Sequence, residues 1–149
     1  MNKKDERICE TLYNLFHANP QYAGCVYLAC PTGKEGPDIS SFFEDMALHA
    51  ETVIFPRMDD GCLTFPEDDE KNDAVVFIPS PALTEGGALQ KSYKSYLQSR
   101  KNIRHRVGIA FQEKHSEKEL PSSARELTDL VVTEEGVMLT NKLRGSQKN

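Results

Sequence analysis

The sequence predicts an α/β protein: a three-layer α/β/α sandwich built on a mostly parallel sheet of four or five strands, with an additional helix at the N-terminus. One pattern in the sequence predicts this fold. Apolar runs typical of buried strands alternate with amphipathic helical patterns from residue 22 onward. This alternation is typical of parallel strands joined by crossover helices. The 149 residues contain no internal repeat and no linker-like stretch, so we expect one domain over 1–149.

Each predicted helix depends on apolar residues that recur at helical spacing. Within the N-terminal segment 1–20, residues 5–18 carry Ile8, Leu12, Leu15 and Phe16 on one face. A second helix begins near Asp38, whose side chain is a suitable N-cap. Its apolar residues Ile39, Phe42, Phe43, Met46 and Ala47 share one face. Two further helices are predicted over 87–101, after a pair of glycines, and over 121–127.

The predicted strands are short apolar runs. They are 22–30, 52–55, 74–78 and 106–112, followed by a closing hairpin or one bent strand over 129–132 and 137–140. Residues 57–72 are acidic and interrupted by Gly and Pro, so we expect a long loop there, with a short helix as an alternative. We expect 144–149 to be a frayed tail.

Composition and charge exclude several classes of protein. Apolar residues make up 38% of the chain and charged residues 28%, which is typical of a globular domain. Its apolar stretches are far shorter than the roughly 20 residues of a membrane span, and the N-terminus lacks a signal-peptide core. We therefore expect a cytoplasmic protein without membrane contact. The net charge of −5 makes a nucleic-acid partner unlikely.

The four cysteines do not suggest a metal site or a redox site. They include no Cys-x-x-Cys pair, and the four histidines are scattered. We expect reduced thiols, and we predict neither a metal nor a cofactor.

Charge is distributed unevenly along the chain. Residues 91–106 contain six Lys or Arg and no acid, whereas 59–70 contain six acids and no base. A solvated face, or two blocks that face each other, would explain this pattern without a partner. The alternative is a surface that binds an acidic protein partner through Lys91, Lys94, Lys101, Arg104 and Arg106.

Two glycine-containing loops are candidates for ligand binding. In open α/β sheets, ligands bind at the carboxyl ends of strands, and the loops 31–37 and 80–87 follow two predicted strands. Their backbone amides could hold an anion, although both loops could instead be simple turns. A nearby lysine or arginine could add charge, and Asp73 could accept a hydrogen bond from a ribose hydroxyl. The candidate ligand-binding residues are Gly33, Lys34, Gly36, Arg57, Asp73, Glu85, Gly86, Gly87 and Tyr93.

Complete catalytic motifs are missing from the sequence. There is no Gly-x-Ser-x-Gly elbow, and the Gly33-Lys34 pair is followed by Glu35, so the phosphate-binding P-loop motif is incomplete. His49-Ala-Glu51 has the His-x-Glu pattern of zinc deaminases but lacks the Pro-Cys-x-x-Cys that must follow it. We therefore predict no catalytic residue.

Short stretches of residues 26–112 resemble the nucleoside 2-deoxyribosyltransferases, a group of small Rossmann-like enzymes. The similar stretches are Val26-Tyr-Leu-Ala-Cys-Pro31, Ile54-Phe-Pro-Arg-Met-Asp-Asp-Gly61, Asp73-Ala-Val-Val-Phe77 and Gly86-Gly-Ala-Leu-Gln-Lys-Ser-Tyr-Lys94. The nucleophilic glutamate of that family falls on Gln90, whose amide cannot form the glycosyl ester that a carboxylate forms. The resemblance therefore implies an inactive or nucleotide-sensing relative.

These observations leave three functions open. We expect a non-enzymatic protein-interaction or accessory module. The alternative is a domain that binds a nucleotide or another phosphorylated small molecule, and the third is an enzyme whose site the sequence does not reveal.

Overall fold

The computed structural model describes residues 3–30, 37–47, 50, 52–59, 62–66, 71–84, 87–111 and 122–140, with the backbone alone for 58, 59, 62, 84 and 122–124. The helices are α1 (Lys3–Ala18), the short 3-10 helix η1 (Pro20–Tyr22), α2 (Ser40–Met46), α3 (Ser80–Thr84), α4 (Ala88–Ser99) and α5 (Ser122–Leu127). The strands are β1 (Val26–Leu28), β2 (Thr52–Ile54), β3 (Arg57–Asp59), β4 (Cys62–Thr64), β5 (Ala74–Pro79), β6 (Ile103–Ile109), β7 (Leu130–Thr133) and β8 (Gly136–Leu139).

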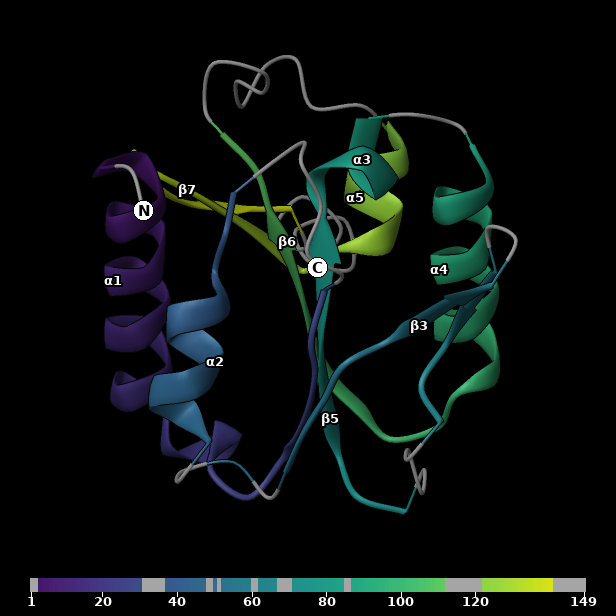
Figure 1. Cartoon of the computed structure of the whole chain (residues 1–149), viewed down its shortest axis with the longest axis horizontal. Helices are drawn as coiled ribbons and strands as arrows, with labels where there is room; N and C mark the ends of the chain where they lie inside the picture. Colours follow the sequence, from purple (N-terminus) through teal and green to yellow (C-terminus); the bar gives the residue numbers. More distant parts are fainter. Residues whose placement is uncertain are drawn as a thin grey trace, which may run out of the picture.

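The fold class predicted from the sequence is confirmed. A six-stranded sheet of order β2-β1-β5-β6-β7-β8 lies between two layers of helices. Helices α1 and α2 cover one face, and α3, α4 and α5 cover the other (Figure 1). The first five strands in this order are parallel to their neighbours, and β8 is antiparallel to β7.

The order of the strands creates a topological switch point between β1 and β5. Within the sheet, β2 lies next to β1 on one flank. The chain later returns to β5 on the other flank of β1, and β6 and β7 follow beyond it. At such a point the two crossover connections leave neighbouring strands in opposite directions, which opens a crevice at their carboxyl ends.

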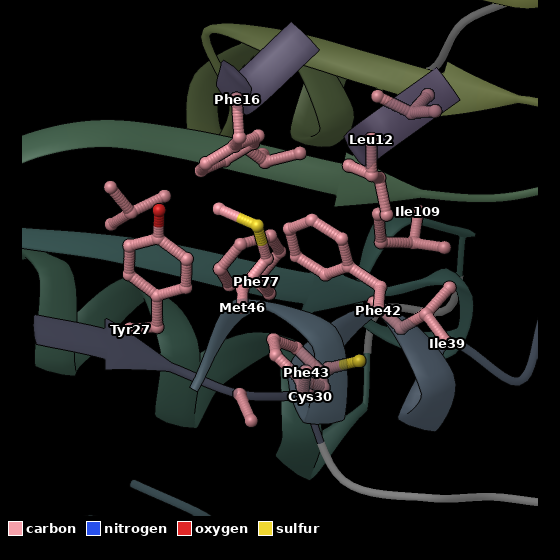
Figure 2. Close-up of a cluster of buried hydrophobic side chains, with 14 of the residues drawn as sticks. Leu12, Phe16, Tyr27, Cys30, Ile39, Phe42, Phe43, Met46, Phe77 and Ile109 are labelled. Carbon is pink, nitrogen blue, oxygen red and sulfur yellow. The ribbon is translucent and has the colours of Figure 1, made fainter. Parts of the chain in front are cut away.

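An aromatic core joins α1 and α2 to the sheet (Figure 2). The ring of Phe77 on β5 lies among those of Phe16, Tyr27, Phe42 and Phe43, with centroids 5.0–5.8 Å away. All five side chains are buried. Val107 and Ile109 of β6 join this core, whereas Ala110, directly after the strand, joins the core on the other face.

The second core lies under α3, α4 and α5. Tyr93 of α4 and Leu83 of α3 are fully buried against Val76, Ile78 and other side chains of the sheet. Gly108 of β6 is part of this packing, because a Cβ at its position would lie 2.9 Å from Cγ2 of Thr128.

The prediction of a long loop over 57–72 is partly wrong. Residues 57–59 and 62–64 form the antiparallel pair β3 and β4. Leu63 and Phe65 are buried beside α4, where the ring of Phe65 lies 5.0 Å from that of Tyr96. The contact with α4, which is remote in sequence, explains why the Gly- and acid-rich pattern of this segment did not predict it.

Other boundaries also differ from the prediction. The expected strand 22–30 is reduced to β1, because Pro20 begins the one-turn helix η1. Strand β6 begins at Ile103, three residues before the predicted start. Helix α3 follows β5 at once, since Pro81 in its first turn costs no intrahelical hydrogen bond. The predicted closing hairpin is confirmed as β7 and β8, and Gly136 has the positive φ of +134° that few other residues adopt. Because β8 joins the same sheet, the strand count exceeds the predicted four or five.

Candidate functional site

The carboxyl edge of the sheet at the switch point is the candidate site for a small molecule. Strands β1 and β5 are hydrogen-bonded neighbours, with Leu28 opposite Val76. The described chain leaves β1 through the buried residues Ala29 and Cys30 and leaves β5 through the buried Ser80. The predicted loop 31–37 thus follows β1, whereas the predicted loop 80–87 needs correction: its first part is helix α3, so Gly87 follows α3 and not β5 directly. The candidate residues Gly33, Lys34, Gly36, Glu85 and Gly86 lie outside the described residues.

Gly87 is placed at the same edge, directly before α4. Crossover helices run antiparallel to the strands they connect, so the N-terminal end of α4 lies at the carboxyl edge (Figure 1). Gly87 is exposed, and a Cβ at its position would meet no atom within 4 Å. No side chain caps α4 at Gly87. The first N–H groups of a helix have no partner within the helix and carry partial positive charge, so an anion is stabilised there.

Two other residues of α4, Gln90 and Tyr93, form hydrogen bonds with backbone carbonyl oxygens of the fold. Tyr93 is fully buried, and its hydroxyl donates a hydrogen bond of 3.3 Å to the carbonyl oxygen of Phe77. Burial raises the pKa of Tyr93. Gln90, which the predicted resemblance aligns with a nucleophile, donates its amide to the carbonyl oxygen of Ala82 at 3.0 Å. Tyr93 therefore holds α4 on the sheet, and its predicted contact with a ligand stays a prediction.

The prediction that Asp73 shares a site with the glycine loops needs correction. Asp73 immediately precedes β5, so it lies at the amino edge of the sheet, whereas the loops leave the carboxyl edge. The six residues of β5 separate the two edges by about 20 Å. The carboxylate of Asp73 forms an ion pair with Arg104 instead. Arg57 is exposed at the start of β3, and a contact with a ligand stays a prediction for it.

A groove between α4, β6 and α5 brings together part of the predicted basic surface. It consists of two adjoining hollows that share Leu97 and Arg106. One, of about 400 Å³, is lined by Lys94, Leu97, Gln98, Arg106, Glu126 and Leu127. The other, of about 600 Å³, is lined by Leu97, Arg100, Ile103, Arg104, His105, Arg106 and Asp129. We call them together the α4–β6 groove. Lys91 and Lys101 are exposed but line neither hollow.

The arginines of the groove are held in place by neighbouring oxygens. Arg106 contacts Asp129 through Nη2 at 3.1 Å, and its backbone N–H donates to the same carboxylate at 2.9 Å. Arg100, which the sequence analysis did not list as a site residue, is buried. It donates to the carbonyl oxygens of Asn72, Lys101 and Asn102. These oxygens lie after α4 and before β5, and no motif in the sequence indicated the contacts.

His105 contributes to the opposite face of the sheet. Its Nδ1 lies 2.8 Å from the hydroxyl of Tyr22. Burial is the main cause that lowers the pKa of His105. The imidazole and the Tyr22 hydroxyl share this hydrogen bond, so His105 serves the packing of η1 against β6.

Among the cysteines whose side chains the structure describes, Cys9, Cys25 and Cys30 are free thiols. Complete burial raises the pKa of Cys30 to about 12, so this thiol is not a nucleophile at neutral pH. Among the residues that the structure describes, no cluster of three His, Cys, Asp or Glu side chains could hold a metal ion. None of the described helices has the length and apolar character to span a membrane.

Two solved structures share this fold. The 5,10-methenyltetrahydrofolate synthetase of Mycoplasma pneumoniae superimposes with a TM-score of 0.61 at 15% sequence identity, over 88% of this chain and 85% of that one. The 5,10-methenyltetrahydrofolate synthetase of Aquifex aeolicus gives a TM-score of 0.54 at 16% identity, over 90% of this chain and 81% of that one. No protein-family model and no curated protein sequence matches the chain. At these identities the likeness concerns the fold, and the resemblance to nucleoside 2-deoxyribosyltransferases stays a prediction.

Proposed function

We propose that this domain binds a small anionic molecule at the carboxyl edge of its sheet, between the ends of β1 and β5. One observation carries the proposal. The predicted glycine loop 31–37 follows β1, and the neighbouring parallel strand β5 leads through α3 to Gly87, at the point where the strand order reverses. Open α/β sheets bind their ligands at this point.

The class of ligand follows from two arguments. The glycine amides, Lys34 and the N-terminal end of α4 favour a negatively charged group. Two solved structures that share the fold are 5,10-methenyltetrahydrofolate synthetases. We therefore propose a folate derivative as the first ligand class and a nucleotide, or another phosphorylated small molecule, as the second.

Thermal unfolding with added ligand tests this proposal. The candidates are 5,10-methenyltetrahydrofolate, ATP, AMP and inorganic phosphate, each at millimolar concentration. A ligand present at 100 times its Kd stabilises the folded state by about 2.7 kcal/mol. That corresponds to a rise in Tm of about 5–11 °C for a chain of this size. If none of the four raises Tm, the proposal is wrong.

A matched pair of variants at Gly87 tests the position of the site. Asp and Asn are both good helix N-caps, and neither Cβ meets an atom within 4 Å. Gly87→Asp places a negative charge at the N-terminal end of α4 and should weaken binding of an anionic ligand at least tenfold. Gly87→Asn should bind nearly as the original does. Equal binding by both variants would move the site away from α4.

A second function, that of a protein-interaction module, is favoured by a different observation. Three of the five basic residues predicted to contact a partner, Lys94, Arg104 and Arg106, come together in the α4–β6 groove. Selection of random nine-residue peptides on the immobilised domain tests this function. We expect peptides whose binding is lost in the variant Lys94→Glu. Failure to select any peptide would contradict the function.

A further inference from the structure

The α4–β6 groove has the chemistry of a peptide-binding surface rather than that of a closed pocket. Its lining mixes partly or fully buried apolar side chains, Leu97, Ile103 and Leu127, with charged ones. Four cations and two carboxylates, Glu126 and Asp129, line the two hollows, and a third carboxylate, that of Asp73, pairs with Arg104. The groove is therefore locally positive in a chain whose net charge is −5.

The positions of these side chains along the groove define a pattern. Leu97 and Arg106 line both hollows and so lie at its centre, whereas Lys94 lines one hollow and Arg104 the other. The groove thus has a cation toward each end, and in the middle an apolar side chain beside Arg106, which is paired with Asp129. The part of β6 from Ile103 to Arg106 is about 10 Å long, which is the length of about three residues of extended peptide.

Lys94 is the cation that is most available to a partner. Its side chain is exposed, and it forms no ion pair with any part of the chain that the structure describes. The arginines differ, because Arg104 pairs with Asp73 and Arg106 with Asp129. Those pairs fix the guanidinium groups along β6, and a guanidinium has five N–H donors, more than one carboxylate can occupy.

From this arrangement we infer that the α4–β6 groove docks a short, extended, acidic segment of a partner protein, with an apolar residue between two carboxylates. The apolar side chain packs on Leu97, one carboxylate meets Lys94, and the other meets Arg104. This inference rests on the second function proposed above and specifies its partner. Nucleic acid fits the groove less well, because Glu126 and Asp129 would repel a continuous phosphate backbone.

Amide chemical shifts of the ¹⁵N-labelled protein test the inference. The probe is the peptide acetyl-Glu-Glu-Leu-Glu-Glu-amide, and its neutral counterpart acetyl-Gln-Gln-Leu-Gln-Gln-amide is the control. We expect the acidic peptide to shift amides of residues 94–106 and 126–129 with saturation, and the neutral peptide to bind at least tenfold more weakly. Shifts confined to other residues, or no saturable shifts at 5 mM peptide, would overturn the inference.

A matched pair of charge reversals separates a local contact from the overall charge. Lys94→Glu and Lys91→Glu change the same charge on exposed positions of the same helix, one turn apart, but only Lys94 lines the groove. We expect Lys94→Glu to raise the Kd of the acidic peptide at least tenfold and Lys91→Glu to raise it less than threefold. An equal loss in both would show that the peptide responds to overall charge and would overturn the inference.

Two further titrations distinguish the partner class. Inorganic phosphate and a ten-nucleotide poly-uridylate, each at the same concentration of negative charge, should shift the groove amides less than the acidic peptide does. If either binds there as tightly, the groove is an anion or nucleic-acid site and the inference is wrong. If selected nine-residue peptides bind but shift amides elsewhere, the interaction function stands and this assignment of its surface fails.

Discussion

Removing the ring of Phe77 is expected to cost this protein about 3–5 kcal/mol of its free energy of unfolding. Phe77 is fully buried, and its ring touches aromatic rings from α1, β1 and α2 (Figure 2). Since these neighbours belong to three different elements, no single movement can fill the cavity that Phe77→Ala leaves. For a chain of this size the loss corresponds to a fall in Tm of about 6–20 °C. Against a typical total of about 5–15 kcal/mol, the variant should remain folded but marginal.

Urea unfolding followed by circular dichroism measures this loss, provided that the m-value is unchanged. Phe55→Ala is the matched control. The side chain of Phe55 is 53% exposed, and it touches the core through the ring of Phe43. We expect the control to lose less than about 1 kcal/mol. If Phe77→Ala lost no more than Phe55→Ala, the aromatic cluster would not be the core that joins the helices to the sheet.

Three other perturbations test individual residues. Tyr93→Phe removes one buried hydrogen bond and should lower stability by about 0.5–1.5 kcal/mol in urea unfolding, while ligand affinity stays unchanged; a loss of affinity would make Tyr93 a ligand contact. Gly108→Ala should cost about 1–3 kcal/mol, because its Cβ would overlap Thr128; an unchanged urea midpoint would refute the close packing of β6. Burial lowers the pKa of His105 below its ordinary value of 6.5, so the unfolded chain takes up a proton first as the pH falls. Stability should therefore decline below about pH 6.5, and His105→Gln should reduce this decline between pH 7 and pH 5; an unaltered pH profile would contradict the assignment.

The candidate sites were predicted only in part. Sequence reasoning placed the two glycine loops after buried strands, and the sheet order then brought those strands together. It grouped Asp73 with them because Asp73 is close to β5 in sequence. Asp73 comes before β5, however, and the second predicted loop comes after it, so the two lie at opposite edges of the sheet.

The basic surface shows a similar division. Charge counting found the run of Lys and Arg over 91–106. Which of these side chains share one groove depends on the packing of α4 and α5 across β6, and this packing selected Lys94, Arg104 and Arg106 but not Lys91 or Lys101. The sequence could not show this, because helix α5 contributes one wall from about 20 residues farther along the chain.

By itself, the sequence determined the fold class. Apolar residues at helical spacing in 5–18 and the apolar run 74–78 are local patterns, and burial of such patterns favours helix or strand wherever the segment packs. Only the tertiary structure decided the order of the strands, the pairing of β3 with β4, and the meeting of α4, β6 and α5 in one groove. These features depend on contacts between segments far apart in sequence, whose free energy no local pattern records.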